Sequence, residues 1–225
     1  MGGSGSLGRA MVASLKARSN WRVLSVDLSP NSEADQSLVL SGGKVQEQLP
    51  HIYEETKAFS PTFDSIICVA GGFGISSVTD DDVLEKYQEM DRMNFQSALL
   101  SGHLGTKFLA PQGLLMFTGA AAVFEGPVNF AYGYAISKAA THHLALQMAE
   151  LTEIPESSTV ITILPQIIDT PGNREAMPDA DTAEWQPPAR IADLVRSWAE
   201  GDNRPENGSF AKLKYENGII VPEFM

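Results

Sequence analysis

Cysteine, basic residues and long apolar runs are all scarce in this sequence of 225 residues. Cys68 is the one cysteine, which excludes an internal disulfide and suits a reducing compartment. It stands in an apolar stretch, so we expect a buried structural thiol there and not a nucleophile. No stretch approaches the roughly 18 apolar residues of a membrane helix, and no signal-peptide pattern is present. We therefore expect a cytoplasmic protein.

Acidic residues outnumber basic ones by 28 to 16, which gives a net charge of −12. Nucleic acids and anionic membranes bind basic surfaces, so this balance argues against both as partners. The hydrophobic content of 43% and the charged content of 20% are those of an ordinary globular protein. The length fits one domain over residues 1–225 with a large core.

A tyrosine and a lysine four residues apart, Tyr134 and Lys138, lie in the apolar run 132–151. On a helix this offset places both side chains on one face. An ammonium beside a phenol favours the phenolate, so we expect the pKa of Tyr134 to fall towards neutrality and the residue to act as a proton donor. The pattern is loose when it stands alone, and its meaning depends on the rest of the chain.

The chain begins with a glycine-rich turn that contains G-x-G-x-x-G at Gly3, Gly5 and Gly8. Helical spacing over 7–18 and a strand over 22–26 that ends at Asp27 complete the parts of a dinucleotide site. Asp27 would bind the adenosine ribose and repel a 2′-phosphate, so we expect NADH to be preferred, with NADPH less favoured. The turn is predicted to contact the cofactor pyrophosphate through Gly3, Gly5, Ser6, Leu7 and Gly8.

A dinucleotide motif normally follows a strand, whereas only Met1 precedes Gly2 here. That strand would be central in the sheet, and its loss would leave a gap between its neighbours. We therefore expect either residues upstream of Met1 or a start that was assigned too late.

The rest of the chain alternates helical and strand patterns, as in a parallel α/β sheet. Residues 29–44 are polar and carry no clear signal, and residues 171–188 read as a long polar loop, a candidate lid over a substrate. Periodicity predicts helices at 45–59, 79–109, 132–151 and 191–198, strands at 63–70, 113–118 and 159–164, and a hairpin over 209–221.

Small residues follow the strand at 63–70, where a cofactor can lie over the backbone. We predict cofactor contacts at Ala70, Gly71 and Gly72. Phe73 comes next, and it forms either an aromatic wall near the nicotinamide or a plain packing contact. The acidic run 80–82 is predicted to begin a helix, since no complementary cluster of metal ligands accompanies it. No metal site is predicted.

The order of these features resembles that of the short-chain dehydrogenase/reductase family. The features are the glycine turn, Asp27, the small residues after the strand at 63–70, Asn94, Tyr134 with Lys138, and Pro165 followed by Thr170. The resemblance implies a doubly wound Rossmann-type parallel sheet. It also implies that Pro165 and Thr170 lie at the nicotinamide and that Lys138 binds its ribose and assists Tyr134.

A narrower set of motifs is similar to the members of that family that reduce pteridines. Most members have a serine about 13 residues before the tyrosine to hold a carbonyl, where this chain has Ala121 in a run of alanines. Asn94, by contrast, matches the broad family. The most specific motifs are Leu164-Pro165, Asp169-Thr170-Pro171, Asn173-Arg174, Met177-Pro178, Ala180-Asp181 and Trp185.

This narrower resemblance implies NADH-dependent reduction of a quinonoid dihydropteridine. It places the pterin between Phe73 and the loop 171–188, in contact with Tyr134, Asn173 and Met177. It also implies a homodimer joined by the helices at 81–109 and 134–151. Two alternatives stay open at this point: a short-chain reductase of another carbonyl, quinone or pteridine, and a non-catalytic nucleotide-binding relative.

Overall fold

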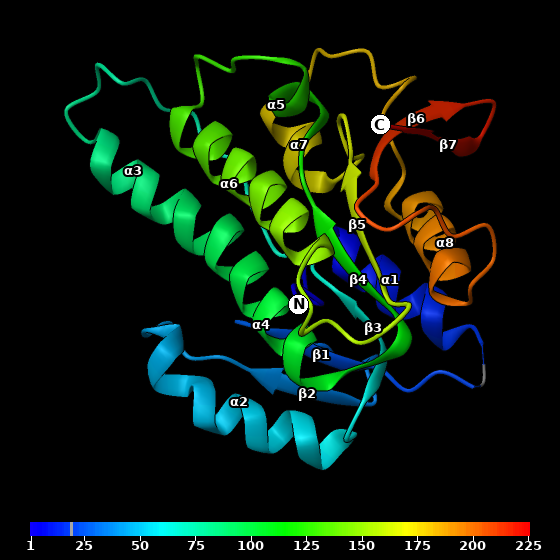
Figure 1. Cartoon of the computed structure of the whole chain (residues 1–225). Helices are drawn as coiled ribbons and strands as arrows, with labels where there is room; N and C mark the ends of the chain where they lie inside the picture. Colours follow the sequence, from blue (N-terminus) through cyan, green and yellow to red (C-terminus); the bar gives the residue numbers. More distant parts are fainter. Residues whose placement is uncertain (19) are drawn as a thin grey trace.

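Parallel strands with helices on both faces form the body of the protein, seen in a computed structural model that describes residues 1–18 and 20–225 (Figure 1). One sheet has the order β3-β4-β5-β6-β7, parallel except for the antiparallel pair β6 and β7. A parallel pair, β1 and β2, lies beside it. The strands are β1 (Leu24–Asp27), β2 (Gln36–Val39), β3 (Phe63–Ile67), β4 (Leu109–Thr118), β5 (Thr159–Leu164), β6 (Phe210–Glu216) and β7 (Ile219–Phe224).

Helices connect these strands and include one π-helical segment, η1. Their bounds are α1 (Ser6–Lys16), α2 (Val45–Phe59), α3 (Val83–Met90), η1 (Asp91–Gln96), α4 (Ser97–Phe108), α5 (Ala121–Glu125), α6 (Tyr132–Ala149), α7 (Pro171–Ala176) and α8 (Pro188–Ala199).

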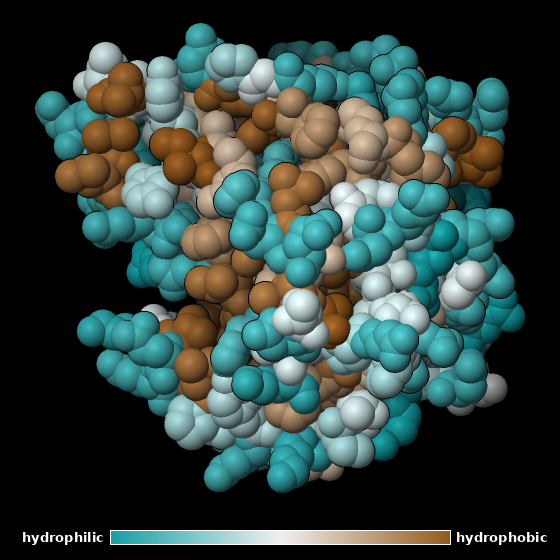
Figure 2. Space-filling view, in the orientation of Figure 1, coloured by the Kyte–Doolittle hydropathy of each residue, from teal (hydrophilic) through white to brown (hydrophobic). Residues whose placement is uncertain are grey.

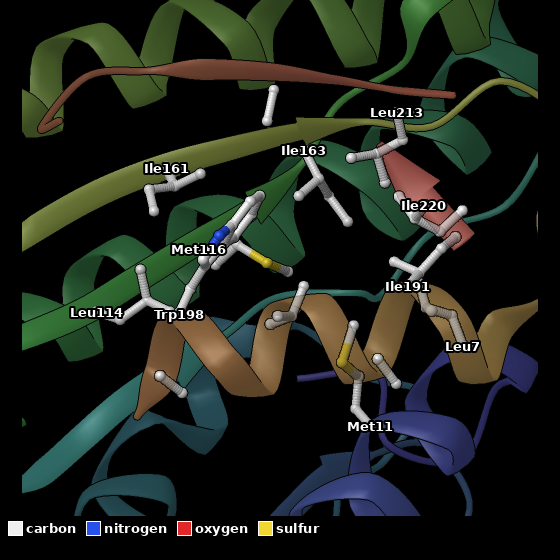
Figure 3. Close-up of a cluster of buried hydrophobic side chains, with 14 residues drawn as sticks. Leu7, Met11, Leu114, Met116, Ile161, Ile163, Ile191, Trp198, Leu213 and Ile220 are labelled. Atoms are coloured by element: carbon white, nitrogen blue, oxygen red, sulfur yellow. The ribbon is translucent and has the colours of Figure 1, made fainter. Parts of the chain in front are cut away.

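The central strands are buried on both faces, so successive residues serve two separate cores. Ile161 and Ile163 of β5 pack with Trp198 of α8 in the core that also includes residues of α1 (Figure 3). Val160, the residue before Ile161, packs with Ala145 of α6 on the opposite face. This arrangement is the doubly wound fold that the family resemblance implied, built on the parallel sheet that the alternating pattern predicted. Cys68 is buried, as expected.

The gap expected beside the glycine turn is present between β1 and β3. Met1 and Gly2 bridge it at one end. The Met1 amino group donates to Ile67 O (2.8 Å) and its carbonyl accepts from Val69 N (3.0 Å) on the β3 side, whereas Gly2 N donates to Val26 O of β1 (2.9 Å). Beyond Met1 a cavity of about 310 Å³ separates the two strands. Ser25 and Ser65 line this cavity, and their hydroxyl oxygens are buried without a hydrogen-bond partner within the described chain.

Most predicted elements match the structure, and two segments differ. Residues 29–44, which carry no clear signal in the sequence, contain β2, a four-residue strand with a single buried residue, Leu38, too short for its apolar pattern to be recognised. The predicted loop 171–188 begins with α7, which Thr170 caps by accepting a hydrogen bond from Asn173 N. The helix expected over 79–109 is continuous as α3, η1 and α4. Among the described residues, no helix combines the length and the apolar character that crossing a bilayer requires.

Candidate active site

The carboxyl ends of the parallel strands meet at one edge of the fold, as parallel pairing requires. Asp27 ends β1, the small residues 70–72 follow β3, and Thr118 ends β4. The amino end of α1 and the first turns of α6, with Tyr134 and Lys138, are near the same edge. The structure therefore brings together the glycine turn, the acidic residue and the tyrosine–lysine pair that were predicted from the sequence.

The glycines of the first turn have two different roles. Gly2 adopts a φ of +81°, and a Cβ on Gly8 would lie 1.9 Å from Gly2 O, so both positions exclude a side chain. A Cβ on Gly3 would lie 2.3 Å from the Ser25 hydroxyl. Gly5 differs, because a Cβ there would meet only Gly2 O at 3.7 Å. Gly5 is exposed and is the N-cap of α1, so the open amino end of this helix fits an anionic ligand.

Ser6 and Leu7, two predicted cofactor contacts of this turn, differ in their exposure. Ser6 is exposed in the first turn of α1. Leu7 packs its side chain into the hydrophobic core. Any contact of Leu7 with a cofactor must therefore use its backbone.

Asp27 also organises the turn. Its carboxylate accepts hydrogen bonds from the backbone N–H groups of Ser4 (2.8 Å), Leu28 (2.6 Å) and Ser29 (3.3 Å). A carboxylate has about four acceptor positions, so room remains for a ribose hydroxyl. The residue thus holds the glycine turn against the end of β1 and keeps a negative charge beside it.

A cavity of about 480 Å³ opens next to this turn, at the notch on the left of Figure 2. Its size is in the range of small-molecule sites. The predicted contacts Gly5, Asp27, Ala70 and Gly71 line it, which supports a fit to a nucleotide. Sequence reasoning missed its opposite walls, formed by residues 41–43, Arg92, Met93 and Gln96. For residues 41–43, the only pattern in the sequence is a Ser-Gly-Gly turn, and it follows a strand that was not recognised.

Lys138 connects this cavity to Tyr134. Its ammonium lies 6.0 Å from the centre of the Tyr134 ring and donates to Thr118 O at 2.9 Å. A Cβ on Gly71 would lie 3.3 Å from the same ammonium, so the segment that follows β3 passes directly beside it. The tyrosine–lysine pair therefore shares one helix face, as predicted, and its ammonium lies beside Gly71 in the lining of this cavity.

The pKa of Tyr134 contradicts the sequence-based expectation. Burial raises the pKa of Tyr134 to about 12, and burial lowers the pKa of Lys138 to about 8. The Lys138 ammonium was expected to lower the pKa of Tyr134. Instead, the ammonium donates its hydrogen bond to the Thr118 carbonyl, and the loss of water around the phenol has the larger effect on the tyrosine pKa. Tyr134 consequently retains its proton at neutral pH, the protonation state that a proton donor needs.

Asn94 holds the turn after β3 in place. Its side-chain amide donates to Gly72 O (3.2 Å) and to Ser137 Oγ (3.0 Å), and its carbonyl accepts from Gly72 N (3.0 Å). It lies in η1, and π-helical segments occur frequently at functional sites. These contacts join Gly72 to α6 directly. Ser137 was not identified from the sequence.

Aromatic rings line the space in front of Tyr134. Phe73 is 54% exposed, and its ring lies 5.0 Å from that of Tyr134 in an edge-on arrangement. Phe130, which sequence reasoning missed, lies 6.4 Å from Phe73. The exposed Phe73 ring thus packs beside the phenol, and its place relative to a nicotinamide stays a prediction.

Residues after β5 hold one another in place at the same edge. Pro165 O accepts from Ala121 N (3.1 Å), and Thr170 Oγ1 accepts from Asn173 N (3.2 Å). The Asn173 amide donates to Ile168 O at 2.8 Å. The Thr170 and Asn173 side chains, predicted to contact cofactor and substrate, thus hold the base of the loop, and Met177 is half-buried further along it.

Comparison with known proteins agrees with this geometry. The chain is 34% identical over 223 residues to a dihydropteridine reductase from Dictyostelium discoideum, covering 98% of this chain and 95% of the relative. A short-chain dehydrogenase family protein from Francisella tularensis superposes with a TM-score of 0.77 at 21% identity, over 94% of this chain and 93% of the other. A short-chain dehydrogenase from Shigella flexneri complexed with NADP superposes with a TM-score of 0.77 at 22% identity, over 94% and 93%. No family model matches the sequence.

Proposed function

The chain belongs to the dihydropteridine reductases, an NAD(P)H-dependent oxidoreductase group with the short-chain dehydrogenase/reductase fold, and we propose that it reduces a quinonoid dihydropteridine to the tetrahydropteridine with NADH. One observation carries the proposal: the Lys138 ammonium lies beside Gly71, which lines a cavity of nucleotide size, and 6.0 Å from the ring centre of a protonated Tyr134. In this proposal residues 1–225 form one domain, and the site residues named above all belong to it.

The chain's own groups can hold each part of the cofactor. The open amino end of α1 at Gly5 would bind the pyrophosphate, and Asp27 would accept from the adenosine ribose. Lys138, beside Gly71, would donate to the nicotinamide ribose, and the backbone from Pro165 to Thr170 would hold the carboxamide. Bound NADH supplies the hydride. A negative charge at Asp27 disfavours a 2′-phosphate, which supports NADH over NADPH.

Tyr134 completes the reduction by supplying a proton or a hydrogen bond to the polar edge of the pterin. Its raised pKa keeps the phenol protonated across the neutral range. Lys138 carries its charge below about pH 8 and stabilises the phenolate that forms as the proton leaves. Hydride and proton together convert the quinonoid dihydropteridine to the tetrahydropteridine.

The substrate side of the site favours a flat heterocycle. Phe73 and Phe130 provide aromatic surface next to Tyr134 for stacking a pterin. Ala121 stands where most relatives by fold carry a hydroxyl for a carbonyl, so a simple ketone would lack a partner there. Residues 171–188, with Asn173 and Met177, would cover the pterin.

A substrate panel with NADH tests the substrate assignment. Quinonoid dihydropteridine is expected to be reduced with the highest kcat/KM, above simple ketones, quinones and a folate-type pteridine. We expect a low kcat/KM with ketones because Ala121 offers no hydroxyl to hold the carbonyl. Faster reduction of a ketone or a quinone would favour another short-chain reductase. NADH binding without oxidation on any of these substrates would indicate a non-catalytic relative.

An apolar surface over α3, α4 and α6 supports a homodimer. Apolar side chains gather over α3 and α6 in Figure 2, and exposed residues on these helices include Leu84 (73%), Ile136 (50%), Leu99 (47%) and Leu146 (46%). Contiguous apolar patches of this kind mark association surfaces. Sedimentation of the pure protein should give twice the mass of the 24.3 kDa chain.

We also place the protein in the cytoplasm, since its one cysteine is a buried free thiol.

A further inference from the structure

His142, one turn beyond Lys138 on α6, makes a hydrogen bond that the proposed mechanism does not use. Its Nε2 accepts from the backbone N–H of Ala120 at 3.1 Å, which requires a neutral ring with its proton on Nδ1. The ring packs against Phe124 of α5 (5.8 Å) and edge-on against Phe210 of β6 (5.7 Å). His142 is 9% exposed, so water cannot readily replace it as the acceptor for this N–H.

The turn after β4 is shaped to admit this imidazole. A Cβ on Gly119 would lie 2.3 Å from His142 Nε2 and 2.6 Å from its Cδ2. Any side chain at Gly119 would therefore displace the ring. His142 therefore fits closely against the turn at Gly119. The same turn carries Ala121, at the position where most members of the fold family have a serine.

The same turn anchors Lys138. The ammonium donates to Thr118 O (2.9 Å), two residues before the Ala120 N–H that His142 holds. The Thr118 hydroxyl donates to Cys68 O at the end of β3 (2.8 Å), and Ala121 N donates to Pro165 O after β5 (3.1 Å). Residues 118–121 thus connect three strand ends to the helix that carries the tyrosine–lysine pair.

We infer that His142 is a positioning residue, which fixes the backbone of 118–120 and thereby holds the Lys138 ammonium where it can bind the cofactor ribose. The inference rests on the proposed function only through the contact of Lys138 with the cofactor. Without an acceptor, the buried Ala120 N–H would be unpaired, and the turn would shift to satisfy it. The carbonyl that anchors Lys138 would shift with it.

Protonation provides a second way to break this contact. Burial, and secondarily the charge of Lys138, lower the pKa of His142 to about 4. Other charged groups on the elements packed around the ring are Glu125 of α5 and Lys212 of β6, which form an ion pair with each other. As the pH falls to about 4, His142 gains a proton on Nε2, and two N–H groups then face each other.

Three variants separate positioning from packing. His142→Phe keeps a ring but removes the acceptor, His142→Gln restores an acceptor that does not titrate, and His143→Phe changes the exposed neighbour as a control. We expect His142→Phe to raise the NADH Kd and lower kcat/KM by about 10-fold or more, the usual effect of an unpaired buried donor. His142→Gln should stay within about threefold of wild type, and His143→Phe should not differ from it. NADH affinity of the wild type should fall between about pH 5 and 4, whereas that of His142→Gln should not.

Unchanged NADH affinity in His142→Phe, with only a lower melting temperature, would overturn the inference. An equal fall in NADH affinity between about pH 5 and 4 in the wild type and in His142→Gln would also overturn it. If His142→Phe does not fold, the comparison of these two pH profiles decides alone. NADH binding is measured without a pterin, so a wild-type protein that fails to reduce pteridines would refute the proposed function and leave this test intact.

Discussion

Replacing Tyr134 with phenylalanine is expected to lower kcat by about 10² to 10⁴, the usual contribution of general acid catalysis. The change removes only the hydroxyl, because the aromatic ring and its edge-on contact with Phe73 are retained. A quinonoid substrate accepts hydride readily and needs less help from an acid, so we expect a loss near the lower end of this range. NADH affinity should change little, since the phenol is not the main cofactor contact.

Tyr132→Phe is the matched control, because Tyr132 is a half-buried tyrosine on the same helix, two residues away and on a different face. It should leave turnover unchanged. Near-normal turnover of Tyr134→Phe, measured as NADH consumption, would remove the tyrosine from the mechanism. The pH dependence gives a second check: burial raises the pKa of Tyr134 to about 12, so its ionisation should not limit turnover below about pH 11.

Replacing Lys138 with methionine is expected to separate activity from stability. Methionine fills a similar volume without a charge, so kcat/KM should fall by about 10² or more through lost cofactor binding and lost support of Tyr134. Stability should rise or hold at neutral pH, because Lys138 is 5% exposed and burial of an ammonium without a carboxylate partner is unfavourable. Steady-state kinetics and thermal unfolding on the same samples measure both.

The direction of the pH effect follows from the pKa of Lys138, which burial lowers from 10.5 to about 8. Between these values the unfolded chain binds a proton that the folded chain has lost. The free energy of unfolding of the wild type should therefore rise, relative to Lys138→Met, as the pH increases from 8 to 10.5, with a slope of about 1.4 kcal/mol per pH unit. Lys107→Met, at an exposed position on α4, should show neither effect. A strong loss of stability in Lys138→Met would contradict this account.

The fold could be predicted from the sequence because the apolar residues of its longer helices and strands follow clear patterns. The helix over 45–59 and the strand over 159–164 have the same bounds in the structure as α2 and β5. In β5 every residue is buried, so an unbroken apolar run identified it. β2 has four residues and one buried side chain, which is too little pattern to detect.

The site was only partly predictable, because several of its features depend on packing between distant segments. The offset of Tyr134 and Lys138 is local, and it correctly placed both on one helix face. The tyrosine pKa depends on burial by other elements, and the expected direction was wrong. His142 bonds to Ala120 across 22 residues, and the walls at 41–43 and Arg92 come from separate segments. No spacing in the sequence encodes these contacts.

The most direct test of the central claim is NADH consumption with freshly generated quinonoid dihydropteridine, measured beside the same reaction with NADPH. We predict rapid oxidation of NADH with formation of one tetrahydropteridine per NADH, a higher kcat/KM than with NADPH, and loss of most of the rate in Tyr134→Phe. Binding of NADH to the folded protein without its oxidation in the presence of this substrate would contradict the account.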